Sequence, residues 1–195
     1  MKQEQTLVLV KPDGLARGLI GEILARFERV GIKVVALKML RPTRDLADRH
    51  YALTEEWMLG VFTKAKAKYE ANGEIFPYSD YKIYGQTIKD GLVEFIASGP
   101  VVATVLQGEQ VVSLVRKLVG ATESASAAPG TIRGDFSLDT YALSNEQNRP
   151  IRNLIHASGT IEEAKNEIAI WFLPEEIHEH ASVLDPVLYD EKKFR

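Results

Sequence analysis

Residues 6–11 read TLVLVK, a short continuous apolar run that ends on a lysine. A run of this kind, with no polar alternation, predicts a strand buried on both faces of a sheet. Pro12, Asp13 and Gly14 follow at once, and these residue types are typical of a turn. We therefore expect the chain to leave a buried strand at Lys11 and to turn sharply there.

Outward from this strand, apolar periodicity predicts alternating helices and strands. Ile20, Ile23, Leu24 and Phe27 recur at helical spacing, which predicts an amphipathic helix over residues 18–30. Strands are predicted over 33–40, 101–107 and 151–156, a second amphipathic helix over 109–119, shorter helices over 43–51 and 92–97, and a further helix after Thr160.

The order strand–helix–strand occurs twice and matches the split βαβ unit of ferredoxin-like folds. We therefore expect an α+β fold, a ferredoxin-like split βαβ sandwich, in which a mostly antiparallel four-stranded sheet carries helices on one face. With 195 residues, 45% of them hydrophobic, the chain can bury a substantial core. We expect a single domain over residues 1–195, with an insertion at 52–90 and a C-terminal arm at 182–195.

Composition excludes several classes of protein. No apolar run approaches the roughly 20 residues of a membrane helix, and no apolar signal-peptide stretch follows the first five residues. The chain has no cysteine, which excludes disulfides and thiolate metal sites. The net charge of −3 argues against a dedicated nucleic-acid binder. A cytoplasmic location is expected.

Residues 52–90 show the least regular pattern of the chain. Seven aromatic residues from Trp57 to Tyr84 alternate there with Lys64, Lys66, Lys68 and Lys82. Aromatic rings and lysines together can stack on bases and bind phosphates, so a nucleic-acid-binding module is one interpretation. Acidic residues in the same stretch favour the other interpretation, an insertion whose rings pack on the domain or on a neighbouring subunit; they include Glu55, Glu56, Glu70, Glu74 and Asp80.

A histidine marks the most promising site for chemistry. Residues 153–158 read NLIHAS, so His156 lies at the end of a predicted strand. Thr160 with Glu163 three residues later forms a capping-box pattern, which predicts a helix start just beyond it. An imidazole beside a helix N-terminus is well placed to handle an anion. On position alone, a structural core histidine is the more frequent case.

Several polar side chains fall at the ends of predicted elements or in loops. Arg133 lies between Gly130 and Gly134, which let the backbone approach a ligand closely. Arginine forks suit phosphate oxygens, and lysine adds a point charge. Taken singly, each cation could equally form a surface salt bridge; together they would make a polyphosphate site. The set comprises Lys11, Arg116, Thr122, Arg133, Asn153 and His156.

Five sequence blocks resemble the signature blocks of nucleoside diphosphate kinases, and they occur in that family's order. They are KPDG at 11–14, RGLIGEI at 17–23, SGPVVA at 98–103, PGTIRGDF at 129–136 and NLIH at 153–156. No phosphate-binding loop of the GxxxxGK[ST] type and no protein-kinase HRD or DFG motif is present. The resemblance covers most of the chain outside 52–90, 140–150 and the tail.

The resemblance implies a phosphotransferase of nucleotide metabolism. His156 would accept the γ-phosphoryl group of a nucleoside triphosphate, mainly ATP, and pass it to a nucleoside diphosphate in a ping-pong exchange. Glu167 would hold the other nitrogen of that ring, and Ser158 matches a family serine close to the histidine. Tyr51 would pack near the imidazole.

The resemblance also implies a nucleotide site. Lys11, Arg116, Thr122 and Arg133 would bind the phosphates, with Mg²⁺ carried on the β- and γ-oxygens rather than held by protein ligands. Asn153, together with Lys11, would contact the sugar 3′-hydroxyl. The expected partners are nucleoside tri- and diphosphates and further copies of the chain, because family members form symmetric oligomers, commonly hexamers built from dimers. Neither a membrane nor nucleic acid is expected as a partner.

The sequence departs from the family pattern at three places. The phenylalanine that stacks on the base in the family aligns with Ile88, so Ile88, Tyr84 and Tyr81 are alternative stacking residues. Residues 123–126 read ESAS where the family has Asn-Pro, and Gly159 stands where an aspartate is common. None of these changes removes a charged group of the motif, which argues against a catalytically inactive homologue.

The remaining histidines are weaker candidates. His178 and His180 follow Pro174, which predicts a helix start, and two residues apart on a helix they would point in different directions. A shared metal is therefore not expected there. His50 precedes Tyr51 and is expected to line the cleft.

Overall fold

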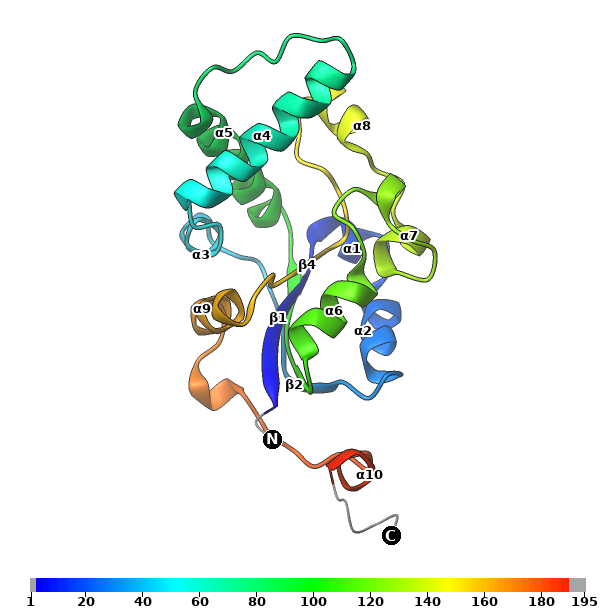
Figure 1. Cartoon of the computed structure of the whole chain (residues 1–195). Coiled ribbons are helices and arrows are strands. Elements are labelled where there is room, and N and C mark those ends of the chain that lie inside the picture. Colours follow the sequence, from blue (N-terminus) through cyan, green and yellow to red (C-terminus); the bar gives the residue numbers. More distant parts are fainter. Residues whose placement is uncertain (1–2, 190–195) are drawn as a thin grey trace.

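The computed structural model describes residues 3–189 and confirms the α+β fold (Figure 1). Four strands form one antiparallel sheet in the order β2-β3-β1-β4. The strands are β1 (Glu4–Val10), β2 (Lys33–Leu40), β3 (Val101–Gly108) and β4 (Ile155–Ala157). The helices are α1 (Pro12–Ala16), α2 (Ile20–Glu28), α3 (Arg44–His50), α4 (Glu55–Ala71), α5 (Tyr81–Ala97), α6 (Val111–Val119), α7 (Ile132–Phe136), α8 (Tyr141–Glu146), α9 (Ile161–Trp171) and α10 (Asp185–Tyr189), with 3-10 turns η1 (Ser124–Ser126) and η2 (Pro174–Glu176).

Strand β1 lies between β3 and β4, which explains its continuous apolar run. Leu7, Val8, Leu9 and Val10 have no exposed surface. Leu9 is paired with His156 of β4 on one side and with Ala103 of β3 on the other. The predicted buried strand at 6–11 is thus confirmed. It pairs with β4, the strand that carries His156.

Helices cover both faces of the sheet, so the expectation that they would lie on one face only was wrong. Val8 and Val10 point to a core with Phe27 of α2 and Val115 of α6. Leu7 and Leu9 point to a second core that includes residues of α3, α5 and α9. Figure 1 shows α2 and α6 on one side of the sheet and α3 and α9 on the other. Successive side chains of a strand point to opposite faces of the sheet. Because β1 is apolar at every position from Leu7 to Val10, both faces need to be covered.

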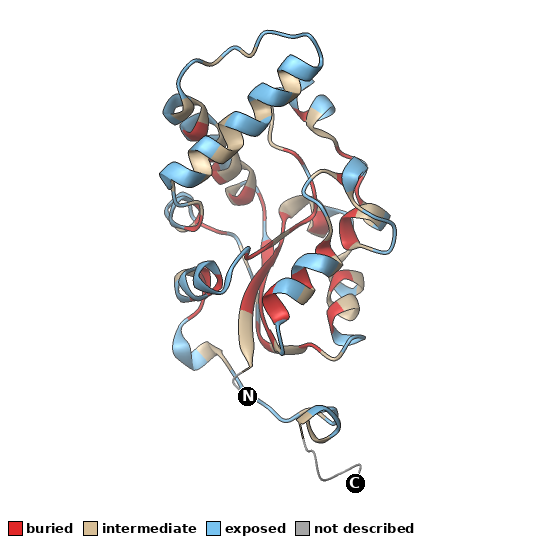
Figure 2. Ribbon diagram, in the orientation of Figure 1, coloured by how far each residue is buried: buried red, intermediate tan, exposed pale blue. Residues whose placement is uncertain are grey.

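Residues 52–90 are more regular than the sequence indicated, because they hold α4 and most of α5, each 17 residues long. The helix expected over 92–97 begins at Tyr81. Helix α4 fully buries none of its residues (Figure 2), and the charged residues interspersed along it mask the helical spacing of Met58, Phe62 and Tyr69. Gly85 of α5 lets the two helices approach, since a Cβ there would lie 2.5 Å from Cγ of Met58.

The remaining differences concern short elements. The fourth strand covers Ile155–Ala157 rather than 151–156, and the long loop at 122–135 contains η1 and the start of α7. Pro174 begins only a single 3-10 turn, so His178 and His180 do not lie on a helix. The predicted arm holds α10, and its residues 190–195 lie outside the described part of the chain. Within residues 3–189, no helix combines the length and apolar character needed to cross a membrane.

Candidate functional site

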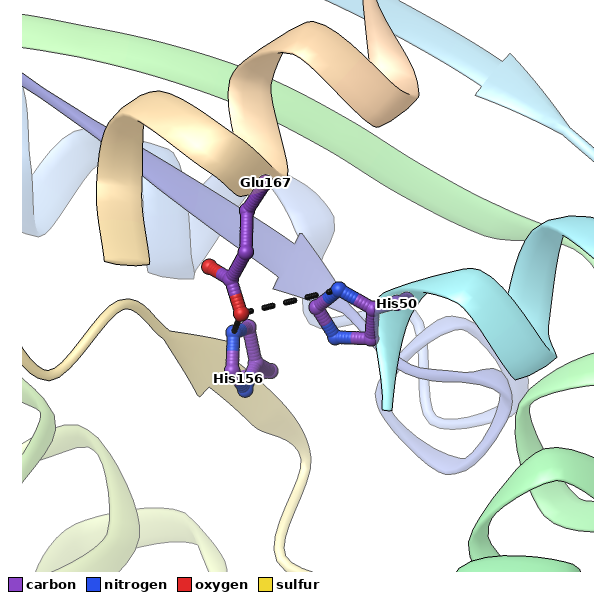
Figure 3. Close-up of side chains that lie close together, drawn as sticks. All are labelled: His50, His156 and Glu167. Atoms are coloured by element: carbon purple, nitrogen blue, oxygen red, sulfur yellow. Dashed lines mark hydrogen bonds and ion pairs between the residues drawn. The ribbon is translucent and has the colours of Figure 1, made fainter. Parts of the chain in front are cut away.

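His156 lies on β4, where its side chain keeps 18% of its surface exposed. Its Nε2 lies 2.8 Å from Oε1 of Glu167, which projects from α9 (Figure 3). The other carboxylate oxygen accepts a 2.6 Å hydrogen bond from Oγ of Ser158. Ser158 is itself fixed to β1, because its Oγ accepts from the backbone N–H of Leu7 at 3.2 Å. The imidazole is therefore held by groups from three elements.

The hydrogen bond to Glu167 determines which nitrogen of His156 is free to react. A carboxylate only accepts, so Nε2 carries the proton and Nδ1 presents its lone pair. Burial, and after it the neighbouring cations Lys11, Arg133 and Arg116, lower the pKa of His156 to about 3. Burial also raises the pKa of Glu167, an effect that His50 and the Ser158 hydrogen bond oppose. The imidazole is thus neutral and nucleophilic near neutral pH.

His50 forms a second layer behind His156. Its Nδ1 accepts a 3.2 Å hydrogen bond from Nε1 of Trp171 and lies 3.6 Å from Oε1 of Glu167. Its ring centroid is 4.5 Å from that of His156. Burial, followed by the proximity of His156, lowers the pKa of His50 to about 3, so this ring is neutral as well. The sequence suggested only that His50 lines the cleft.

Donor atoms of His50, His156 and Glu167 lie within 4.8 Å of one another, close enough to be considered as a metal site. Nδ1 of His50 is already occupied by the indole N–H, and both oxygens of Glu167 are occupied by Ser158 and His156. A metal ion would have to displace these hydrogen bonds. We therefore interpret the group as a hydrogen-bonded network that orients the His156 ring.

Lys11 and Asn153 meet beside this ring. Nζ of Lys11 donates a 2.7 Å hydrogen bond to Oδ1 of Asn153, and Nδ2 of Asn153 donates one of the same length to the carbonyl oxygen of Thr122. Burial, helped by Arg133 and opposed by Asp13, lowers the pKa of Lys11 to about 8. A buried cation with so little negative charge around it would gain stability from a bound anion.

Arg133, on α7, reaches the backbone of the segment just before His156 and that of Gly120. Its guanidinium donates to the carbonyl oxygens of Asn153 at 3.2 Å, Gly120 at 3.0 Å and Ile155 at 2.7 Å. Three of its five N–H groups are thus used, which leaves two for a ligand. Burial, followed by the nearby Arg116, lowers the pKa of Arg133 to about 10. Arg133 therefore fixes the backbone at residues 153–155, just before His156, and places a positive charge beside it.

The other predicted site residues surround the same region. Arg116, on α6, donates a 3.4 Å hydrogen bond to the carbonyl oxygen of Ala157. Tyr51 follows α3 and packs its ring 4.6 Å from that of His50; burial raises the pKa of its phenol. The structure therefore brings together the histidine, its glutamate, the tyrosine and the cations.

The three alternative base-stacking residues have different surroundings. Tyr84 packs in an aromatic cluster and Tyr81 donates a 2.6 Å hydrogen bond to Oε1 of Glu55, whereas Ile88 is half-buried. The aromatic cluster consists of Phe62, Tyr69, Phe76, Tyr78 and Tyr84. Most of its rings pack edge-on against one another and one pair is tilted, so the rings contact each other rather than form a free stacking platform for nucleic acid.

Sequence reasoning missed one contribution to the site, from Asp13. Leu154 has a φ of 69°, a left-handed conformation that is strained for a leucine. Its N–H donates to Oδ2 of Asp13 at 2.9 Å, and its carbonyl oxygen accepts from the N–H of Lys11 at 2.8 Å. A Cβ on Gly14 would lie 2.9 Å from that carbonyl oxygen, so glycine is required there. The residues noted only as a turn in fact clamp the strand that carries His156.

Comparisons with known proteins agree with this geometry. The family model described as nucleoside diphosphate kinase matches residues 4–76 and 78–177. A nucleoside diphosphate kinase of Pyrobaculum aerophilum is 45% identical over 184 residues, which cover 92% of this chain and all of that protein. One from Dictyostelium discoideum, named as cytosolic, is 41% identical over 91% of this chain and 89% of its own length.

Two solved structures resemble the fold closely. The crystal structure of the P. aerophilum NDP kinase has a TM-score of 0.87 and 44% identity, and the match covers 91% of this chain and 100% of that one. A nucleoside-diphosphate kinase from Borrelia burgdorferi, solved as a transition-state mimic with vanadate and ADP, has a TM-score of 0.78 and 38% identity over 95% and 96% of the two chains.

Proposed function

This chain belongs to the nucleoside diphosphate kinase family, and we propose that it moves the γ-phosphoryl group of a nucleoside triphosphate, mainly ATP, to a nucleoside diphosphate through a phosphohistidine on His156. One observation carries the mechanistic part of this proposal. Nε2 of His156 is held by Glu167, which leaves Nδ1 free as the nucleophile within a group of buried cations.

The exchange takes two balanced steps. In the first, Nδ1 attacks the γ-phosphorus; an N–P bond forms, the bond to the β–γ bridging oxygen breaks, and the diphosphate leaves with that oxygen. The imidazole gains positive charge as the N–P bond forms, and the Glu167 carboxylate on its Nε2–H stabilises that charge. In the second step, a terminal β-phosphate oxygen of another nucleoside diphosphate attacks the phosphorus and restores the free histidine.

The cations around His156 support a role in holding the phosphates. We propose that Lys11, Arg116, Thr122 and Arg133 bind the phosphate chain, with Asn153 and Lys11 at the sugar hydroxyl and Tyr51 packed beside the ring. Mg²⁺ would arrive as part of the nucleotide substrate. Charge spread over the transferring phosphoryl group is stabilised by such fixed cations because they need no rearrangement during the reaction.

Phosphoenzyme formation tests the proposal. Purified protein incubated with γ-labelled ATP is expected to acquire an acid-labile, base-stable label, as a phosphoramidate does. Addition of an unlabelled nucleoside diphosphate should then release the label as the corresponding triphosphate. An acid-stable label, which would indicate a phosphoester, or a label that no diphosphate removes, would contradict the proposal.

The lowered pKa of Lys11 predicts a pH dependence of nucleotide binding. Below its pKa of about 8 the ammonium is charged and can hold a phosphate; above it the amine is neutral. The kcat/KM for the nucleotide should therefore fall by up to about tenfold per pH unit above pH 8, since free-enzyme ionisations appear in this parameter. The Lys11→Met variant should have a lower kcat/KM that lacks this decline. A wild-type profile that stays flat from pH 7 to 9.5 would contradict the assignment.

Assembly and domain organisation stay proposals. We propose that the chain is a single domain that forms a homo-oligomer, with a hexamer as the first state to test by light scattering. Strand β2 lies at an edge of the sheet and exposes more than half of the side-chain surface of Leu37 and Met39, and Leu138 is almost fully exposed. Exposed apolar groups at a sheet edge favour contact with another copy. An insertion at 52–90, an arm at 182–195 and a cytoplasmic location are proposed on the sequence.

A further inference from the structure

Helix α4 packs mainly on α5, and near its C-terminal end it also contacts the loop that follows α6. Figure 1 shows it extending from the vicinity of α3 to that of α8. Near its C-terminal end, Nζ of Lys68 lies 3.2 Å from Oε1 of Glu123 and 5.1 Å from the ring centroid of Tyr141. The same carboxylate oxygen accepts a 3.0 Å hydrogen bond from the N–H of Tyr141. Lys68 thus joins α4 to the loop after α6 and to the start of α8.

A short series of contacts continues from this loop into the proposed site. Glu123 follows Thr122 directly, and the carbonyl oxygen of Thr122 accepts from Nδ2 of Asn153 at 2.7 Å. Oδ1 of Asn153 in turn accepts from Nζ of Lys11 at 2.7 Å. The position of the loop therefore determines how the amide of Asn153 is turned, and with it where the Lys11 ammonium lies.

We propose that Lys68 is a positioning residue for nucleotide binding: by holding Glu123 and Tyr141, it keeps Thr122 where Asn153 and Lys11 are aligned for the substrate. This inference rests on the proposed function. Lys68 acts through the loop that holds Glu123 and Thr122, and it need not touch the nucleotide itself. Its loss leaves the reactive histidine and its Glu167 contact unchanged, so binding should suffer more than chemistry.

The size of the expected effect follows from the exposure of the pair. Side chains of Lys68 and Glu123 keep 41% and 21% of their surface exposed, and ion pairs of this kind contribute modestly. The contact of the ammonium with the Tyr141 ring adds to the pair. We expect Lys68→Ala to raise KM for the nucleotide by about fivefold at low ionic strength, with kcat changed less than twofold.

A double-mutant cycle tests the coupling. Glu123→Gln keeps an acceptor for the Tyr141 N–H but removes the ion pair, so it should raise KM to a similar extent. The double variant should be no worse than either single one, and Lys68→Arg should restore most of the binding. The matched control is Lys66→Ala on the same helix, because Lys66 pairs only with Glu70 of α4 among the ion pairs within residues 3–189.

The outcomes separate this inference from the proposed function. If KM of Lys68→Ala equals that of Lys66→Ala, or if the Lys68 and Glu123 effects add fully, the positioning role is overturned. A double variant that binds as well as the wild type would also overturn it, because repulsion by an unneutralised Glu123 would then be the cause. Failure of the wild type to form a phosphoenzyme would instead reject the proposed function.

Discussion

The His156→Ala variant is expected to form no phosphoenzyme and to lose at least about four orders of magnitude in kcat, because no other group can carry the phosphoryl between the two nucleotides. Nδ1 of this ring is the proposed nucleophile beside Lys11 and Arg133, whereas the ring of His50 is completely buried and hydrogen-bonded to Trp171. Acid-labile label uptake and steady-state exchange between ATP and a second diphosphate measure the two losses.

Controls for this variant come from the same chain. His180→Ala removes an exposed imidazole outside the site and should label and turn over as the wild type does. Circular dichroism should show that His156→Ala is folded, because its ring is partly exposed and makes one side-chain hydrogen bond. Label retained by His156→Ala at more than about a hundredth of the wild-type level would place the nucleophile elsewhere.

Replacement of Arg133 by alanine is expected to lower both stability and activity. The change leaves the carbonyl oxygens of Asn153, Gly120 and Ile155 without this donor. A buried acceptor that loses its partner costs about 1–3 kcal/mol, and water can replace part of the loss, so we expect the free energy of unfolding to fall by about 3 kcal/mol. Because two of these carbonyls belong to the residues just before His156, kcat/KM should fall at least about a hundredfold.

Two further variants separate the structural role of Arg133 from its charge. Arg133→Lys keeps the positive charge, but its single nitrogen cannot take the place of three guanidinium nitrogens that reach three separate carbonyls. It should therefore recover part of the nucleotide affinity and little of the stability. Arg116→Ala loses a single 3.4 Å hydrogen bond and should weaken binding with a much smaller change in stability. Urea denaturation and KM measured on the same samples give both quantities. Equal stability of Arg133→Ala and the wild type would contradict the bracing role.

Features that depend on local apolar patterning were predictable from the sequence. The run at 6–11 indicated a buried strand and the order of elements indicated a ferredoxin-like sheet; both are confirmed. The polar residues predicted for one site do lie around His156, although their roles stay proposals. These residues come together because the end of β1 is paired with the start of β4. The sequence indicated this only through its resemblance to the family's motifs.

Features that arise from tertiary contacts were not predictable. Helix α4 fully buries no residue, and the lysines and glutamates interspersed among its apolar residues hide its helical spacing. The hydrogen bond from Trp171 to His50 joins residues 121 positions apart, and nothing in either local sequence indicates it. The left-handed conformation of Leu154 was equally hidden, because a leucine gives no signal for positive φ.

The clamp on Leu154 makes the reactivity of His156 an indicator of complete folding. A left-handed leucine costs on the order of 1–2 kcal/mol and persists only while Asp13 and Lys11 hold its N–H and carbonyl groups. Those partners lie about 140 positions earlier in the chain, at the end of the central strand. A nascent or partly folded chain in which residues 11–13 have not yet met Leu154 cannot hold the imidazole in this position. Phosphoryl uptake should therefore begin only when this long-range pairing forms, rather than increase gradually with secondary structure.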